Sequence, residues 1–477
     1  MEEQPLIPSK RNPTPLPKRQ LATILFARLA EPIAYTQIFP YIAQMVEELH
    51  IASDKKKIGF YAGLIDGLFA FSQVCTIWYW GRLSDRIGRK PVVLFGLSGV
   101  CIATLLYGLS TSLWQLMLSR ILIGSLCGNV AVIQSMVIDI TDETNAGQAL
   151  PLVSATYSTG AIIGPLIGGL LSHPAERYPN VFGKFELLRR KPFFLPCFIS
   201  SMMTLLSITS SILFLNETLP SIVKTKESVR NSGVEHGYGT TGADPVKPES
   251  QPPTARQLLS DPLVRWLVLA SFVVATIGLG FNALFVLFAY TPIRLGGLDR
   301  QPAEIGLAMS ALGVIGILIT GFVYPHVQQR FDCRNIFIFC MSMWPIVYTL
   351  LPITGMIARA TLPLSNYNLS PPPLGGIWVY VIFTLFLVRI GFLSFSAHFL
   401  IVRSAAQGSN AVGALFGLTQ SAFSLGEGVG PALASSLFAI SIDKMVLGGY
   451  LVWIIMVGLA LGGVQVARIL RGIPQPK

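Results

Sequence analysis

The sequence predicts an all-α, polytopic membrane protein with twelve transmembrane helices in two six-helix bundles, and three observations support this fold class. The first is composition: 52% of the 477 residues are hydrophobic and only 12% are charged. Soluble proteins carry about twice that charged fraction, because a surface in water needs charge whereas a surface in lipid excludes it. The second is a series of apolar runs, each long enough to span a bilayer as a helix. The third is that these runs fall into two sets of six.

A polar segment separates the two sets of apolar runs. Residues 216–262 are rich in Gly, Pro and Ser, which is the composition of a flexible linker. We therefore expect a disordered cytosolic tail at 1–20, bundles at 21–215 and 263–470, a cytosolic linker at 216–262, and a cytosolic tail at 471–477. The runs lie near 21–45, 58–80, 92–111, 113–138, 150–171, 192–215, 265–289, 304–326, 335–357, 375–402, 411–439 and 446–469.

The positive charge of the chain indicates membrane topology rather than nucleic-acid binding. The net charge is +11, but Lys and Arg lie in short connections and not on one face of a domain. Their distribution favours cytosolic termini by the positive-inside rule. The six cysteines lack the spacing of metal ligands, and the sequence shows no set of residues typical of an enzyme active site. We therefore expect no enzyme activity, no catalytic residues, no metal, no cofactor and no nucleic-acid partner.

The connection between the second and third runs carries the most specific motif, GRLSDRIGRKP at residues 81–91. Its glycines permit a tight turn, and its charges alternate at the cytosolic edge of the membrane. A short inside loop is often basic, but this unit resembles the signature loop of the major facilitator superfamily at every defining position. The resemblance implies a gating role for the residues that match the pattern. These residues are Gly81, Asp85, Arg86, Gly88, Arg89 and Lys90.

Asp139 ends the fourth run near the same cytosolic edge. We expect it to pair with Arg86 or Arg89 and to hold the inward gate closed in one state. The alternative is a carboxylate at a helix end that is merely solvated.

Further motifs extend the resemblance over the whole chain. RILIGSLCG, at 120–128, is similar to the fourth-span pattern of the family, and GAIIGPLIGG, at 160–169, to the fifth-span pattern of its proton-linked antiporters. GEGVGPALAS, at 426–435, repeats the GxxxGP element six spans later. ARLAEPIAYTQIFPYI and NETLP look like the fungal and plant drug:proton antiporters and zinc-induced facilitators. The residues of these helix-packing motifs are Gly160, Gly164, Pro165, Gly168, Gly169, Gly430 and Pro431.

Ionisable side chains inside the runs are candidates for the transport site, because each costs about 2.5–3.5 kcal/mol to insert. Arg28 and Glu31 lie three residues apart and share a helix face, and Pro32 weakens the helix beside them. Helical rise places Glu31 near the bilayer centre. Because the first, second and fourth spans are neighbours in the family fold, we expect Glu31 to cluster with Asp66 and Arg120 in the outward half of the first bundle. The candidate residues of the transport site are Arg28, Glu31, Asp66, Arg120, Arg389 and Glu427.

Two interpretations of this cluster remain. It is a static ion pair that fixes helix packing, or it is a proton-coupling site. Burial favours the protonated form of a carboxyl group and a nearby arginine favours the ionised form, so movement of the arginine or entry of a cation can change its charge. Arg389 and Glu427 differ in depth by about a dozen Å, so we hold an ion pair between them and a ligand contact for either as alternatives.

These patterns together predict a transporter of a small organic solute that works by alternating access. We expect proton-coupled antiport, for efflux or vacuolar sequestration; a facilitative uniporter and a non-transporting membrane sensor are the alternatives. The expected partners are the small-molecule substrate, protons and membrane lipid, and the expected state is a monomer. Glu2, Leu6 and Ile7 resemble an acidic dileucine sorting signal, so we expect a vacuolar or lysosomal membrane or the plasma membrane.

Overall fold

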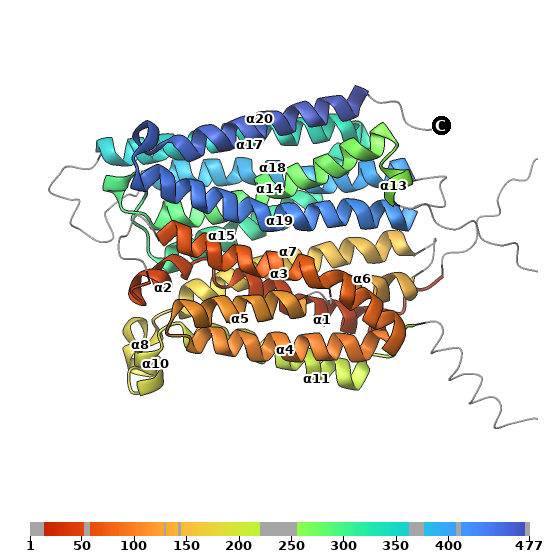
Figure 1. The fold of residues 1–477 in the computed structure, drawn as a ribbon, viewed down its shortest axis with the longest axis horizontal. Coiled ribbons are helices and arrows are strands. Elements are labelled where there is room, and N and C mark those ends of the chain that lie inside the picture. Colours follow the sequence, from red (N-terminus) through yellow and green to blue (C-terminus); the bar gives the residue numbers. More distant parts are fainter. Residues whose placement is uncertain are drawn as a thin grey trace, which may run out of the picture.

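The computed structural model describes residues 14–51, 58–127, 130–141, 145–219, 255–361, 376–406 and 412–472. Within these ranges the chain forms helices and no strands (Figure 1). The long helices lie side by side along one direction, and the short helices α2, α8 and α10 lie together at one end of the array. The sorting signal expected at residues 2–7 and most of the linker lie outside the described residues.

The helices of the first half follow the predicted apolar runs, with the fourth run divided between α5 and α6. Ser112 begins α5 by accepting a hydrogen bond from the backbone N–H of Gln115. The elements are α1 (Lys18–Thr36), α2 (Ile42–Glu48), α3 (Ile58–Ile87), α4 (Arg89–Leu109), α5 (Leu113–Leu126), α6 (Val130–Asp139), α7 (Ala146–Leu171), α8 (Pro174–Arg177), α9 (Pro179–Phe182), α10 (Glu186–Arg190) and α11 (Phe194–Phe214).

The helices of the second half begin at α13 and end at α20. Asp261 caps α14: its carboxylate accepts from Leu263 N–H at 2.8 Å, and Pro262 occupies the first helical position. The elements are α13 (Ala255–Leu258), α14 (Pro262–Tyr290), η3 (Ile293–Leu295), α15 (Pro302–Leu318), η4 (Ile319–Val323), α16 (Tyr324–Arg330), α17 (Cys333–Thr361), α18 (Ile377–Ala406), α19 (Val412–Asp443), η6 (Val446–Gly449) and α20 (Leu451–Gly472).

By length and composition, nine helices in the described part of the chain can cross a membrane, and two further apolar helices, Leu113–Leu126 and Ala155–Leu171, are shorter. α1 is not among them because it carries Lys18, Arg19, Arg28 and Glu31. α1 ends at Thr36, well before the end of the predicted run at residue 45. The reason is Pro40, which has no N–H to continue the helical hydrogen bond to the Thr36 carbonyl. The chain turns there and restarts as α2.

The two halves of the chain pack as two groups of helices, the first drawn in red to yellow and the second in green to blue (Figure 1). Between the groups, α3 packs against α19 and α7 against α15. Small residues let these backbones approach: a Cβ added at Gly169 would lie 3.0 Å from Cα of Gly306, and one added at Gly59 would lie 3.4 Å from the carbonyl oxygen of Ser435. These contacts lie toward the end of the molecule that carries α2. We call this end the outer end, following the predicted topology.

Candidate functional site

Arg28 and Glu31 lie one helical turn apart on α1 and form the first ion pair within the predicted membrane spans. The guanidinium of Arg28 donates to the Glu31 carboxylate, and the two side chains are 8% and 13% exposed. Gln73 of α3 donates to the second carboxylate oxygen of Glu31 at 3.1 Å. The guanidinium also lies 5.8 Å from the ring centroid of Tyr157 on α7. This ion pair therefore joins three helices of the first half.

A second ion pair links Asp66 of α3 to Arg120 of α5, with 3.4 Å between Oδ1 and Nη2. Both residues are buried, and Arg120 has no exposed surface. The guanidinium lies among aromatic rings, at 5.1 to 5.9 Å from their centroids. These rings belong to Tyr35, Phe69 and Tyr107.

The structure pairs these charges differently from the cluster expected from sequence. Arg120 contacts Asp66 and not Glu31, because Arg28, on the same helix as Glu31, already occupies that carboxylate. The pairs also differ in kind. Arg28 and Glu31 move with one helix, whereas Asp66 and Arg120 lie on two helices and separate if those helices shift.

The two candidate charges of the second half do not pair with each other. In the described part of the chain Glu427 of α19 has no hydrogen bond or ion pair. The guanidinium of Arg389 on α18 lies 5.3 Å from the ring centroid of Phe392 and beside Gly316 of α15. The expected alternative of a ligand contact stays a prediction for each.

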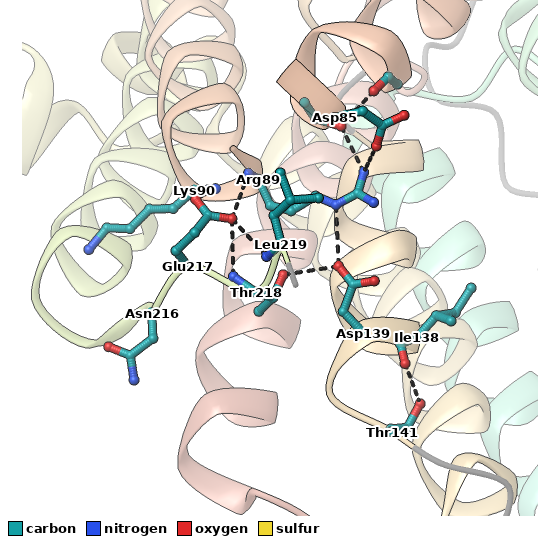
Figure 2. Close-up of polar contacts among 12 residues, drawn as sticks. Asp85, Arg89, Lys90, Ile138, Asp139, Thr141, Asn216, Glu217, Thr218 and Leu219 are labelled. Atoms are coloured by element: carbon teal, nitrogen blue, oxygen red, sulfur yellow. Dashed lines mark hydrogen bonds and ion pairs between the residues drawn. The ribbon is translucent and has the colours of Figure 1, made fainter. Parts of the chain in front are cut away.

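The signature loop forms a network of charges between the end of α3 and the start of α4, at the inner end of the molecule (Figure 2). Arg89 contacts Asp85 at 2.9 Å and Asp139 at 3.3 Å. Asp139 was expected to pair with Arg86 or Arg89, and the structure selects Arg89. Thr218 donates a further hydrogen bond to Asp139 at 3.2 Å. The network thus joins α3, α4 and α6 to the segment that follows α11.

Gly88 and Lys90 complete the turn between α3 and α4. Gly88 has φ +106°, a conformation that residues with a side chain rarely adopt, so the glycine of the motif is required by the backbone. Lys90 Nζ donates to the carbonyl of Ile212 on α11 at 3.0 Å. Gly81 has open space where a Cβ would be added, so the structure shows no packing reason for that glycine.

The GxxxGP element of α7 packs against α1 and the turn that follows it. A Cβ at Gly160 would collide with Pro32, one at Gly164 with Thr36, and one at Gly168 with the carbonyl of Gln37. In the second half, Gly430 of α19 approaches Thr276 of α14 in the same way. Glycines at matching places therefore set close helix contacts inside each half.

Comparison with known proteins now identifies the family. Residues 24–431 match the family model described as the Major Facilitator Superfamily. The chain belongs to the Major Facilitator Superfamily. The "Major facilitator-type transporter psiT2" of Psilocybe cyanescens is 34% identical over 97% of this chain and 93% of that protein. The "Major facilitator superfamily multidrug transporter mfsB" of Aspergillus fumigatus is 26% identical over 90% of this chain and 79% of that protein.

A solved structure shows the same fold. The human organic anion transporter MFSD10 superposes with a TM-score of 0.60 at 17% identity, covering 95% of this chain and all of that one. Plant zinc-induced facilitators are also among the relatives. The predicted fold class and the predicted family resemblance are thus confirmed: this major facilitator is a multi-pass integral membrane transporter.

Sequence reasoning missed one residue that supports the signature loop of this major facilitator. Glu217 lies in the NETLP segment, which the motif comparison used only to indicate the branch of the family. Its carboxylate accepts from the backbone N–H groups of Arg89 at 2.8 Å and Lys90 at 3.1 Å, at the start of α4. An anion at the start of a helix accepts hydrogen bonds from backbone N–H groups that have no partner within the helix, and it interacts favourably with the helix dipole. The sequence signal was an acidic residue directly after a span and beside the basic loop.

A second missed contact joins the two halves of this major facilitator at the outer end. Tyr290, the last residue of α14, donates to Glu47 of α2 at 2.6 Å. Near it, His173 contacts Glu48 at 2.8 Å. The described residues contain no group of three or more His, Cys, Asp or Glu side chains placed to hold a metal ion.

Proposed function

We propose that this transporter is a proton-coupled antiporter that exports or sequesters a small organic solute. The observation that carries the proposal is the placement of two carboxylates, Glu31 and Asp66, each beside an arginine within membrane-spanning helices. Ionisable groups at such depth are costly, and proton relays of pumps and transporters are built from them. Names of the relatives, such as "multidrug transporter", fit an exported organic solute.

The Asp66–Arg120 pair offers a mechanism for coupling. When α3 and α5 shift, the carboxylate loses its cation and binds a proton, since a buried carboxyl group is more stable neutral than as an unpaired anion. When the pair forms again, the proton leaves. If the two arrangements belong to the two orientations of the transporter, each cycle carries a proton across the membrane.

Alternating access has a structural basis in the seam between the halves. The approaches of α3 to α19 and of α7 to α15 lie toward the outer end, where Tyr290 also contacts Glu47. At the inner end, the network around Arg89 joins elements of the first half to one another. Rocking of the halves about the central charges would separate the outer contacts and bring the inner ends of the two halves together.

Transport in sealed vesicles tests the proposal. Purified protein is reconstituted, and a panel of labelled organic solutes is offered with and without an imposed pH gradient. Accumulation that requires the gradient and collapses with a protonophore is expected. Equilibration that is indifferent to the gradient would indicate a facilitative uniporter, and the absence of flux for solutes that bind would indicate a sensor.

Several untested expectations belong to the same proposal. They are a monomer in the membrane, cytosolic termini and linker, and residence in a vacuolar or lysosomal membrane or in the plasma membrane. Imaging of a tagged full-length chain, with and without Leu6→Ala and Ile7→Ala, tests the location. Loss of a vacuolar signal in the variants would support the sorting role of residues 2–7.

A further inference from the structure

We propose that the central site binds organic monocations, such as protonated amines, and that Glu427 of α19 supplies the carboxylate that selects them. The inference names a substrate class for the transporter and rests on the function proposed above. It is carried by a carboxylate that has no partner in the described part of the chain, at a place where the other charges already neutralise one another.

The contacts of α19 show where Glu427 points. Successive residues of a helix are rotated by about 100°, so the neighbours of Glu427 in sequence report the directions around it. On one side, a Cβ added at Gly430 would lie 2.5 Å from the carbonyl oxygen of Thr276 on α14. On the other side, a Cβ added at Gly428 would lie 3.1 Å from Cβ of Ala70 on α3. Glu427 therefore lies between α14 and α3.

The face of α19 that is exposed on the surface of the protein lies opposite to Glu427. Leu425 and Val429 are 51% and 37% exposed, and each is about 200° from Glu427 around the helix. These apolar side chains suit lipid. Glu427 is thus directed into the seam between the two halves of the transporter.

Among the carboxyl groups of this region, Glu427 is the one without a paired cation in the described part of the chain. Glu31, Arg28 and Asp66 of the first half are near enough for their charges to act on Glu427. Arg28 neutralises Glu31, and Arg120 neutralises Asp66. Glu427 has no hydrogen bond or ion pair in the described part of the chain, so an entering organic cation would be the group that stabilises its ionised form.

Two buried groups whose charges act on Glu427 also retain unused polar atoms. Asp66 is 4% exposed and Arg28 is 7% exposed. Neither Asp66 Oδ2 nor Arg28 Nε has a hydrogen-bond partner within the described residues. Asp66 also lines a cavity of about 10 Å³ between the halves, with Ala283 and Ser435 on its far side, which in this arrangement has room for about one water molecule. Buried polar atoms are normally satisfied, so free ones beside an unpaired carboxylate point to a ligand or water that completes the site.

Aromatic rings complete the features expected of a cation site. Glu427 is close enough to Tyr35 and Tyr157 for its charge to act on both side chains. The guanidinium of Arg28 lies 5.8 Å from the ring centroid of Tyr157, and that of Arg120 lies 5.9 Å from that of Tyr35. The two arginines show that these rings attract cations, and organic ammonium ions bind aromatic rings in the same way.

Arg389 provides the competing interpretation, an organic anion. It is a cation of α18 beside Phe392, and in the described part of the chain it does not pair with Glu427. A cation that reaches Glu427, Tyr157 and Tyr35 therefore meets a carboxyl group that no arginine of this set pairs with. Two probes of the same shape and opposite charge separate these interpretations directly.

The test uses tetraphenylphosphonium, a permanent organic cation, and tetraphenylborate, an anion of the same shape. Binding of each to purified full-length protein is measured by equilibrium dialysis at one pH and corrected with protein-free micelles. We expect wild type to bind tetraphenylphosphonium more tightly, and Glu427→Gln to weaken that binding by about tenfold or more. The matched control is Glu186→Gln, which removes an exposed carboxylate from α10 and is expected to change neither affinity.

Three results would overturn the inference. They are tighter binding of tetraphenylborate by wild type, unchanged binding of tetraphenylphosphonium by Glu427→Gln, and an equal loss for both probes in that variant. Should Glu427→Gln fail to fold, Glu427→Asp keeps the charge and is expected to keep the preference for the cation; a reversed preference would refute the assignment.

Failure of this inference and failure of antiport give different results. Glu427-dependent binding of tetraphenylphosphonium without any effect of a pH gradient on uptake would remove proton coupling and keep the cation site. Gradient-driven accumulation with no preference for the cation would keep antiport and remove the cation site.

Discussion

Glu31→Gln is the substitution that best separates proton coupling from a structural ion pair. Glutamine keeps the shape of the side chain and can still accept from Gln73 and Arg28, but it cannot carry a proton into the membrane. If Glu31 carries the coupling proton, the variant should lose accumulation driven by a pH gradient. It should retain exchange of substrate for substrate, since that exchange requires rocking but no net proton movement.

The structure sets the size of the alternative effect. The side chains of Arg28 and Glu31 are only 8% and 13% exposed, so removal of the anion leaves a nearly buried cation. Breaking a buried pair in this way costs about 3–5 kcal/mol. We expect the lower end of that range, because the amide oxygen of glutamine still accepts a hydrogen bond. A purely structural pair therefore predicts a lower yield of folded protein and a similar loss of every transport activity.

A double variant, Arg28→Gln with Glu31→Gln, is the matched control. Removing both charges leaves no unpaired cation, so folding should recover relative to Glu31→Gln alone. The assays are gradient-driven uptake, counterflow exchange and thermal unfolding on the same preparations. Recovery of gradient-driven uptake in the double variant would refute a proton-carrying role for Glu31. Recovered folding with exchange but no gradient-driven uptake would support it.

Three further predictions concern the inner network and the outer seam. Asp85→Asn should impair transport but lower stability by no more than about 1 kcal/mol, because its side chain is 61% exposed; normal transport would reduce the loop to a topology signal. Glu217→Ala should destabilise the start of α4 by about 0.5–2 kcal/mol in thermal unfolding, and Glu217→Gln by less, whereas equal values would exclude a role for its charge. Gly306→Ala should lower the stability of the protein by about 1–3 kcal/mol, because the added Cβ meets backbone atoms of α7, and should increase the labelling of a cysteine introduced at position 47. Gly458→Ala, where a Cβ meets nothing within 4 Å, is the control, and equal cysteine labelling in the two variants would argue against closure at this seam.

The fold and the inner network could be predicted largely from sequence, because their signals are local. Twenty apolar residues specify a span wherever they occur, and the signature loop brings Arg89 within one connection of Asp85. The pairing of Asp139 with one of two arginines followed from its position at the same membrane edge. The choice between Arg86 and Arg89 could not be predicted, because it depends on the turn at Gly88, where φ is +106°. Arg89 begins α4 directly after this turn, and its side chain is only 11% exposed.

The central charges show why the remainder required a structure. Helical rise gives the depth of a residue in the membrane, but it does not give the direction in which a side chain points relative to its neighbours. Depth and the neighbouring spans of the family fold grouped Glu31 with Asp66 and Arg120, whereas the structure pairs Arg120 with Asp66 and Glu31 with Arg28. For Arg389 and Glu427, the difference in depth already made an ion pair doubtful, and the two side chains do not pair in the described part of the chain. The unpaired state of Glu427, on which the proposed cation site depends, is therefore a property of helix packing and not of any motif.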